Sequence, residues 1–315
     1  MYRAFYQLKK PINQKSIAVE DLFISKSFRE GRARLDYMKD KGGFVVVSGP
    51  SGVGKTTLVR SFAESLDSKF FKLAYAPLST VSVIEFYRQL AFLLAGYTPY
   101  KKDLLFRTIQ QTILELALNQ NTIPVIIFDD AHFLKNENFF ELQLISNFNF
   151  DSLSPALFLL IAQPHLLERL KRPAFDAFYQ RISLKINLEP LSLEETQSFI
   201  SHVISNSKAN MNSSDSTGST GSTGSTSQNP DMTMTDTDTD TNTNTDTNTN
   251  HQRPRTRILT PGNLFTPAAI ELIFKRSRGL VRQITTIMQQ ALLYGAANDK
   301  RTIDENVICD IEPEL

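Results

Sequence analysis

The hydrophobic positions of this chain fall into short runs separated by longer amphipathic stretches. Residues 83–95, 103–119 and 166–172 show helical spacing of their apolar positions. The runs around them lack the alternation of a half-exposed strand and are typical of strands buried on both faces. These runs are residues 44–48, 70–75, 124–128, 156–162 and 183–188. The alternation of strands and helices predicts an α/β fold in which helices flank a five-stranded parallel sheet.

Three local patterns predict where further helices begin. Ser192-Leu-Glu-Glu195 is a capping box, and the helix that it opens should run to about Val203. Thr266-Pro267 places a proline in the first turn after an N-cap, and Thr302-Ile-Asp-Glu305 is a second capping box. Apolar residues recur at helical spacing between these last two patterns, so residues 258–315 are expected to form a small α-helical lid.

A polar tract separates the two regular parts of the chain. From residue 205 to 250 the sequence is nearly all Ser, Thr, Asn, Asp and Gly. With almost no side chain to bury, the tract cannot offset the ordering entropy of its backbone, so we expect a disordered insert at 206–257. A neutral spacer and a regulatory segment both fit this composition. The expected domains are therefore an α/β domain at 1–205, the insert, and the lid at 258–315.

The composition is that of a globular protein, with 41% of the 315 residues hydrophobic and 21% charged. It excludes collagen, a coiled coil and a wholly disordered chain. The apolar runs are far shorter than the roughly 18 to 20 residues of a membrane-spanning helix. The N-terminus lacks the apolar core of a signal peptide, and the single Cys309 cannot build a disulfide framework. We therefore expect a cytoplasmic protein without a membrane segment.

The charge is unevenly distributed along the chain. Residues 209–250 hold six Asp and no Lys, Arg or Glu, so the remainder carries +7 although the whole chain carries +1. Such a surplus is compatible with a nucleic-acid partner but does not require one. Candidate contacts to DNA phosphates are Lys101, Lys102 and Arg107, near an expected helix start, and the cluster Arg253-Pro-Arg-Thr-Arg257. A solvated helix start and a solubilising linker end are the alternatives.

The strongest motif is a phosphate-binding loop that directly follows the first expected strand. It reads Gly49, Pro50, Ser51, Gly52, Val53, Gly54, Lys55 and Thr56, with Thr57 next in the following helix. Glycines let successive N–H groups surround phosphates at the helix N-terminus; Lys55 would reach the β- and γ-phosphates and Thr56 would ligate Mg²⁺. The alternative, a glycine turn that happens to precede a lysine, lacks this strand–loop–helix context.

Two carboxylates, Asp129 and Asp130, end the expected strand at 124–128. Next to a phosphate-binding loop, Asp129 would hold Mg²⁺, and Asp130 would orient and deprotonate the attacking water. Acids at this position can also cap a helix, which is the alternative reading.

Three further polar residues are candidates for contacts to the nucleotide. Gln163 ends the next strand, where it could hydrogen-bond the water or the γ-phosphate; it could instead bond its own turn. Arg181 precedes the last strand and Arg282 follows Ser277-Arg-Gly-Leu-Val281 in the lid. Either arginine can stabilise phosphoryl charge, one of them across a subunit boundary, or form a surface ion pair.

These motifs together resemble AAA+ ATPases of the ExeA-like branch. The resemblance rests on the phosphate-binding loop, the Asp-Asp pair, Gln163-Pro, Gln-Arg181-Ile and Gly-Leu-Val-Arg282. Within this branch, residues 79–87 and the opening Tyr2-Arg-Ala-Phe-Tyr-Gln-Leu are similar to short transposase-associated ATPases of the MuB and TnsC type. The resemblance covers residues 1–205 and 258–315.

The resemblance implies a role for each candidate residue. Lys55 and Thr56 correspond to Walker A, Asp129 and Asp130 to Walker B, and Gln163 to sensor 1, while Arg181 corresponds to the arginine finger and Arg282 to sensor 2. It also implies ATP and Mg²⁺ as cofactors. This chain departs from the family in two ways: Asp130 stands where the family usually has Glu, which implies slow hydrolysis, and a long insert replaces a short link before the lid.

Three functions are compatible with these features. The first is a transposition regulator: a homo-oligomer that assembles with ATP on duplex DNA and recruits or activates a transposase. The second is a secretion-type ATPase of the kind that gives the branch its name. The third is a nucleotide-dependent switch with little turnover, which the short Asp130 favours.

Overall fold

The computed structural model describes the chain except residues 1, 13–16, 78–79, 151, 209–263 and 312–315. The expected insert from residue 209 onward and the basic cluster Arg253–Arg257 lie outside the described residues. The division of the chain at residues 205 and 257 therefore stays a prediction. Along the described residues, no helix combines the length and the apolarity needed to span a bilayer.

The centre of the described structure is a five-stranded parallel sheet, and the expected α/β fold is confirmed. Its order is β2-β3-β4-β1-β5. Each strand lies within about two residues of its expected position, the usual uncertainty of such boundaries. The strands are β1 Gly43–Ser48, β2 Phe71–Ala76, β3 Ile123–Phe128, β4 Leu157–Ala162 and β5 Ile182–Asn187. The three middle strands are almost wholly buried, which explains why their sequences show no polar alternation.

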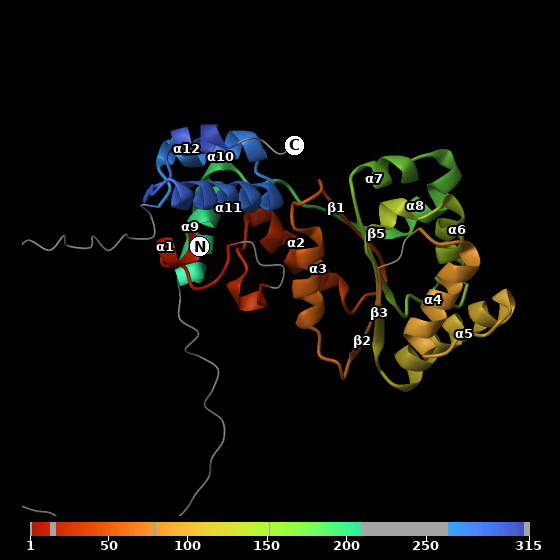
Figure 1. Ribbon diagram of the computed structural model, residues 1–315. Helices are drawn as coiled ribbons and strands as arrows, with labels where there is room; N and C mark the ends of the chain where they lie inside the picture. The colour runs from red at the N-terminus through yellow and green to blue at the C-terminus, as the bar shows by residue number, and fades with distance from the viewer. Residues whose placement is uncertain (1, 13–16, 78–79, 151, 209–263, 312–315) are drawn as a thin grey trace, which may run out of the picture.

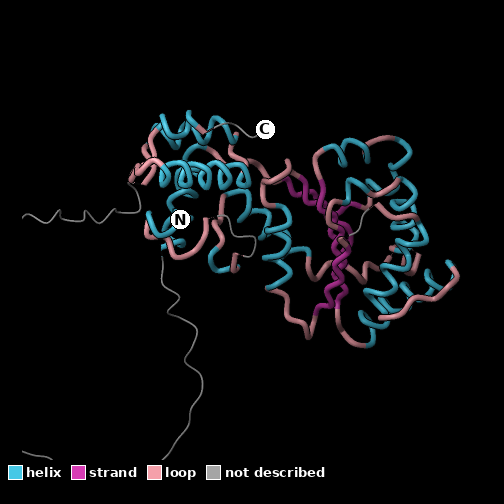
Figure 2. The backbone as a smooth tube through the Cα atoms, in the orientation of Figure 1, coloured by secondary structure: helices cyan, strands magenta, loops and turns pink. Residues whose placement is uncertain are grey.

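Helices cover both faces of the sheet, as Figure 2 shows. Side chains alternate along each strand, so Val45 and Val47 of β1 pack toward one face and Phe44 and Val46 toward the other. The first face is covered by α2 Lys26–Met38 and α3 Lys55–Glu64. The second is covered by α4 Val83–Ala95, α5 Lys102–Leu114, α6 Asn136–Ile145, α7 His165–Leu170 and α8 Asp176–Gln180.

A separate helical bundle lies beside the sheet (Figure 1) and has its own hydrophobic core. Its helices are α9 Leu193–Lys208, α10 Pro267–Ser277, α11 Val281–Ala297 and α12 Glu305–Asp310, with the short α1 Tyr2–Phe5 against α11. The core includes Tyr6 and Leu8 from the N-terminal segment and Ile204 from α9. Both ends of the described chain therefore contribute to the bundle that holds the expected lid.

Two of the three predicted helix starts are confirmed. The Ser192 hydroxyl accepts from the Glu195 N–H, and the Glu195 carboxylate accepts from the Ser192 N–H, each at 3.1 Å. The Thr266 side chain accepts from the Ala269 N–H at 3.2 Å. The capping box at Thr302 is wrong: Ile303 pairs with Phe265 as extended backbone, and α12 begins only after Asp304. The Asp304 side chain caps that helix by accepting from the Val307 N–H at 3.0 Å.

The helix expected to end near Val203 continues to Lys208. Ile204 is buried in the bundle core, and the Ser207 carbonyl accepts from the N–H groups of Lys9 and Lys10 at 2.7 and 3.1 Å. These tertiary contacts hold a polar segment that its own composition would leave unfolded.

Candidate nucleotide-binding site

The phosphate-binding loop connects β1 to α3, as predicted. Gly52 and Gly54 adopt φ values of +78° and +109°, which favour glycine, and Lys55 is the first residue of α3. The Lys55 ammonium donates to the carbonyls of Gly49 and Pro50, each at 2.9 Å, and the side chain is buried. The loop therefore forms a turn around a helix N-terminus with a cation inside it, which is the arrangement that binds phosphate groups.

Electrostatics at Lys55 reflect burial and nearby charges. Burial lowers the pKa of Lys55 below its usual value, while the carboxylates of Asp130 and Asp129 oppose that shift and Arg282 adds to it. Burial thus disfavours the charged ammonium form. A polyphosphate would add further negative charge and stabilise it.

Thr56 and Asp129 lie within reach of one metal ion. The Thr56 hydroxyl is 3.4 Å from both carboxylate oxygens of Asp129, which follows β3. Oxygen donors of this kind fit Mg²⁺, which typically takes one or two protein ligands and completes its shell with phosphates and water. The donor set therefore fits the predicted metal site.

Asp130 adopts a left-handed conformation, with φ +49°, and its side chain is 63% exposed. Its N–H donates to the Asp129 carboxylate at 2.9 Å. The exposed carboxylate is accessible to water. This position fits the role of a general base better than that of a helix cap, since the Asp130 side chain makes no capping bond to the turn that follows.

A buried histidine that the sequence analysis did not single out lies behind Asp130. His132 Nδ1 is 3.9 Å from Asp130 Oδ1, and the His165 ring meets the His132 ring edge-on at 5.1 Å. Burial lowers the pKa of His132, with smaller effects from Asp130 in the opposite direction and from His165 in the same direction. In the sequence, the feature that could have pointed to His132 is its position three residues after Asp129.

Tyr75 is a second side chain that the sequence analysis missed. Its hydroxyl donates to Asp129 Oδ2 at 2.9 Å. Tyr75 ends the strand that was expected at 70–75, but sequence does not reveal that β2 lies beside β3. In the sequence, the feature that could have pointed to Tyr75 is a hydroxyl group at the end of an expected strand.

The strand order brings Gln163 to the same edge of the sheet. Gln163 directly follows β4, and β4 lies between β3, which precedes Asp129, and β1, which precedes the loop. The Gln163 side chain is half-buried, and the backbone carbonyl of Gln163 accepts from the Leu166 N–H. Its predicted contact to nucleotide or water stays a prediction.

The two arginines occupy different places. Arg282 lies in the first turn of α11 beside the loop, and its backbone N–H donates to the Gly52 carbonyl at 3.1 Å. Arg181 precedes Ile182, which pairs with Phe44 at the opposite end of β1 from the loop. Four residues of strand span about 13 Å, so Arg181 is not brought to its own loop. Its predicted role therefore requires a neighbouring subunit.

The part of the chain that contains these residues is similar to known proteins. Residues 38–170 match the family model described as AAA domain, a segment that runs from the end of α2 through α7 and contains Lys55, Asp129 and Gln163. General secretion pathway protein A from Aeromonas hydrophila is 31% identical over 206 residues, which cover 64% of this chain and 37% of that protein. The chain thus spans little more than a third of this curated relative.

Solved structures show the same fold. The Aeropyrum pernix ORC2 protein, in ADPNP and ADP complexes, matches with a TM-score of 0.58 and 14% identity, over 96% of this chain and 70% of that chain. Drosophila ORC bound to DNA matches with a TM-score of 0.56 and 14% identity, over 98% of this chain and 63% of that chain. Similarity to the MuB and TnsC type stays a prediction. Residues 38–170 therefore match the AAA domain model, the described chain shares its fold with the ORC proteins, and the sequence is similar to General secretion pathway protein A.

Proposed function

We propose that the protein binds ATP with Mg²⁺ at the loop of residues 49–57 and hydrolyses it. The observation that carries this proposal is the convergence of Lys55, Thr56 and Asp129 at one edge of the sheet. Lys55 would exchange its carbonyl partners for the β- and γ-phosphates, and Thr56 and Asp129 would hold the metal. Bound Mg²⁺ would neutralise charge that develops on the phosphate oxygens.

Asp130 acts as the base in this proposal. Its exposed carboxylate would accept a proton from water, and Gln163 would orient that water from the neighbouring strand end. Because Asp is one methylene shorter than the Glu usual in the family, the carboxylate stands further from the water. Slow turnover is the expected consequence, and it keeps a nucleotide-dependent switch among the possible functions.

The position of Arg181 supports the proposal that the protein forms a homo-oligomer. Arg181 lies next to the start of β1, and the loop follows the end of that strand, about 13 Å away. Arg181 would therefore contact the nucleotide of an adjacent copy, as an arginine finger supplied in trans. Arg282, whose backbone contacts the loop of its own subunit, would contact the nucleotide bound at that loop from the lid. Assembly and ATP binding would then depend on each other.

For the biological role, we propose a transposition regulator that assembles with ATP on duplex DNA and recruits a transposase. Lys101 and Arg107 are exposed around the start of α5 and are the candidates for phosphate contacts. Lys102 is a weaker candidate, because its ammonium pairs with Glu141 at 2.6 Å and lies 5.4 Å from the Tyr87 ring centre. Drosophila ORC, which shares the fold, was solved bound to DNA.

The second candidate function is a secretion-type ATPase. The 31% identity to General secretion pathway protein A over 206 residues favours it. The matched residues cover 37% of that protein, and a role in secretion is therefore a proposal for this chain.

Fluorescence anisotropy of a labelled duplex, with ATP, with ADP and without nucleotide across a salt series, tests the DNA proposal. We expect ATP-dependent binding that weakens steeply with salt. Lys101→Glu combined with Arg107→Glu should weaken it without changing ATP affinity, while Lys275→Glu, at an exposed position of α10, is the matched control. Absence of binding at low salt with ATP would reject the DNA role; single-turnover hydrolysis would then separate an ATPase from a switch.

A further inference from the structure

Tyr75 contacts the carboxylate that is expected to hold the metal. Its hydroxyl lies 2.9 Å from Asp129 Oδ2, while the Thr56 hydroxyl lies 3.4 Å from both oxygens of the same carboxylate. Oδ1 also accepts from the Asp130 N–H at 2.9 Å. The Asp129 side chain is therefore held on both oxygens by groups from β2 and from its own turn.

The strand register places Tyr75 there. Tyr75 pairs with Ile127 in the parallel ladder between β2 and β3, and Asp129 lies two residues beyond Ile127. Because side chains repeat every second residue on one face of a strand, Tyr75 and Asp129 project to the same face, one step apart diagonally. The Asp129 N–H also donates to the Ala76 carbonyl at 3.3 Å, which continues the ladder to the acid itself.

The phenol is suited to donate at neutral pH. The ordinary pKa of a tyrosine is about 10, so the hydroxyl carries the proton that it donates to Asp129. A donor on one carboxylate oxygen restricts rotation of the carboxylate and leaves its remaining lone pairs directed toward the Thr56 hydroxyl. Groups that orient a metal ligand in this way commonly affect metal affinity by about 10- to 100-fold.

We propose that Tyr75 is a positioning residue for Mg²⁺ binding, acting through its hydrogen bond to Asp129. This inference rests on the proposed function, since it requires that the nucleotide at this loop binds together with the metal. Tyr75 would not touch the nucleotide or the reacting atoms. Its hydroxyl would hold the Asp129 carboxylate in the orientation that, with Thr56, completes the protein part of the metal site.

The test is Tyr75→Phe, which keeps the ring and removes the hydroxyl. Binding of a fluorescent ATP analogue is measured in EDTA and then across a Mg²⁺ titration, and Mn²⁺ binding with ATP is followed by electron paramagnetic resonance. We expect the Mg²⁺ concentration at half-saturation to rise about tenfold, while affinity for the analogue in EDTA changes less than twofold. Tyr97→Phe, at an exposed tyrosine after α4, is the matched control and should change neither value.

The same substitution in an Asp129→Asn protein distinguishes an effect through Asp129 from a general effect of Tyr75 on packing. In an Asp129→Asn protein, Tyr75→Phe should change the Mg²⁺ half-saturation less than twofold, since the group through which Tyr75 acts has been altered. An unchanged or lowered Mg²⁺ half-saturation in Tyr75→Phe overturns the inference, as does an equal loss in both backgrounds. If the wild-type protein binds no ATP analogue even with Mg²⁺, the proposed function itself fails.

Discussion

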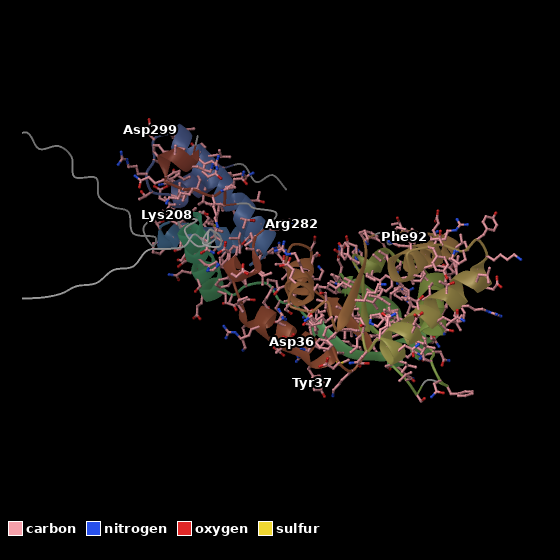
Figure 3. All side chains as sticks on the ribbon, turned by 90° about the horizontal axis from the view of Figure 1, so that it is seen from below. Asp36, Tyr37, Phe92, Lys208, Arg282 and Asp299 are labelled. Carbon is pink, nitrogen blue, oxygen red and sulfur yellow. The ribbon has the colours of Figure 1, made fainter. Side chains whose placement is uncertain are left out.

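The backbone N–H of Arg282 donates a hydrogen bond of 3.1 Å to the carbonyl of Gly52, which joins the helical bundle directly to the phosphate-binding loop. Figure 3 shows Arg282 at the end of the bundle that faces the α/β part of the chain. A Cβ atom on Gly52 would lie 2.9 Å from the Arg282 Cβ, so the approach depends on glycine. The bundle is therefore positioned by the same loop that would hold the phosphates.

Replacing Gly52 by Ala should therefore affect both stability and nucleotide binding. The backbone at Gly52 has φ +78°, where an L side chain costs about 1–2 kcal/mol, and the new methyl group would push Arg282 away. We expect a lower melting temperature and weaker ATP binding, measured by calorimetry.

Gly96→Ala is the matched control for that experiment. Gly96 ends α4 with φ +79°, and a Cβ there would meet nothing within 4 Å. It should lose a similar amount of stability while ATP binding stays as in the wild type. Equal ATP affinity in both variants would contradict a role for the contact between Gly52 and Arg282 in nucleotide binding.

Lys55→Ala should weaken ATP binding strongly. The buried ammonium now donates to two loop carbonyls, and each hydrogen bond to a charged group contributes about 1.5–3 kcal/mol. Losing one such contact to the phosphates should lower affinity by roughly 10- to 100-fold. Calorimetry measures this, with Lys275→Ala on α10 as the exposed lysine control. Unchanged affinity in Lys55→Ala would contradict the assignment of the phosphate-binding loop.

Asp130→Asn should retain Mg²⁺–ATP binding and lose turnover, because the amide cannot accept a proton from water. Asn tolerates the left-handed backbone at this position, so the fold should be unaffected. Asp130→Glu should keep or raise turnover, since the longer side chain moves the carboxylate toward the water. Single-turnover hydrolysis measures both variants. Equal rates in the wild type and Asp130→Asn would show that Asp130 is not the base.

Much of this architecture could be predicted from the sequence, since local patterns specify it. Strands buried on both faces need continuous apolar runs, and a loop that wraps phosphates needs glycines before a helix. The contacts between distant segments could not be predicted. The hydrogen bond from Tyr75 to Asp129 depends on β2 lying beside β3, and the extension of α9 to Lys208 depends on packing against the N-terminal segment.

The pH dependence of stability should reflect His132. Burial lowers its pKa from the usual 6.5, so below that value the unfolded chain binds a proton that the folded protein resists. The free energy of unfolding should therefore fall as the pH is lowered from about 6.5. His132→Phe, which keeps a ring against His165, should show a smaller decrease over the same range. Urea denaturation at a series of pH values measures the difference, and parallel curves would contradict it.

Arg181 should act across a subunit boundary. Because Ile182 pairs with Phe44 at the end of β1 opposite to the loop, Arg181 cannot serve its own site, and Arg181→Ala should bind nucleotide but lose ATPase activity. Mixing it with Asp130→Asn creates interfaces in which one subunit supplies Asp130 and its neighbour supplies Arg181. In a random equal mixture with head-to-tail interfaces, roughly a quarter of the sites are intact in this way, so activity should recover toward that fraction. Native mass spectrometry confirms that mixed assemblies form. If they form without recovered activity, Arg181 does not act in trans, and its distance from its own loop then leaves it a structural role at the start of β5.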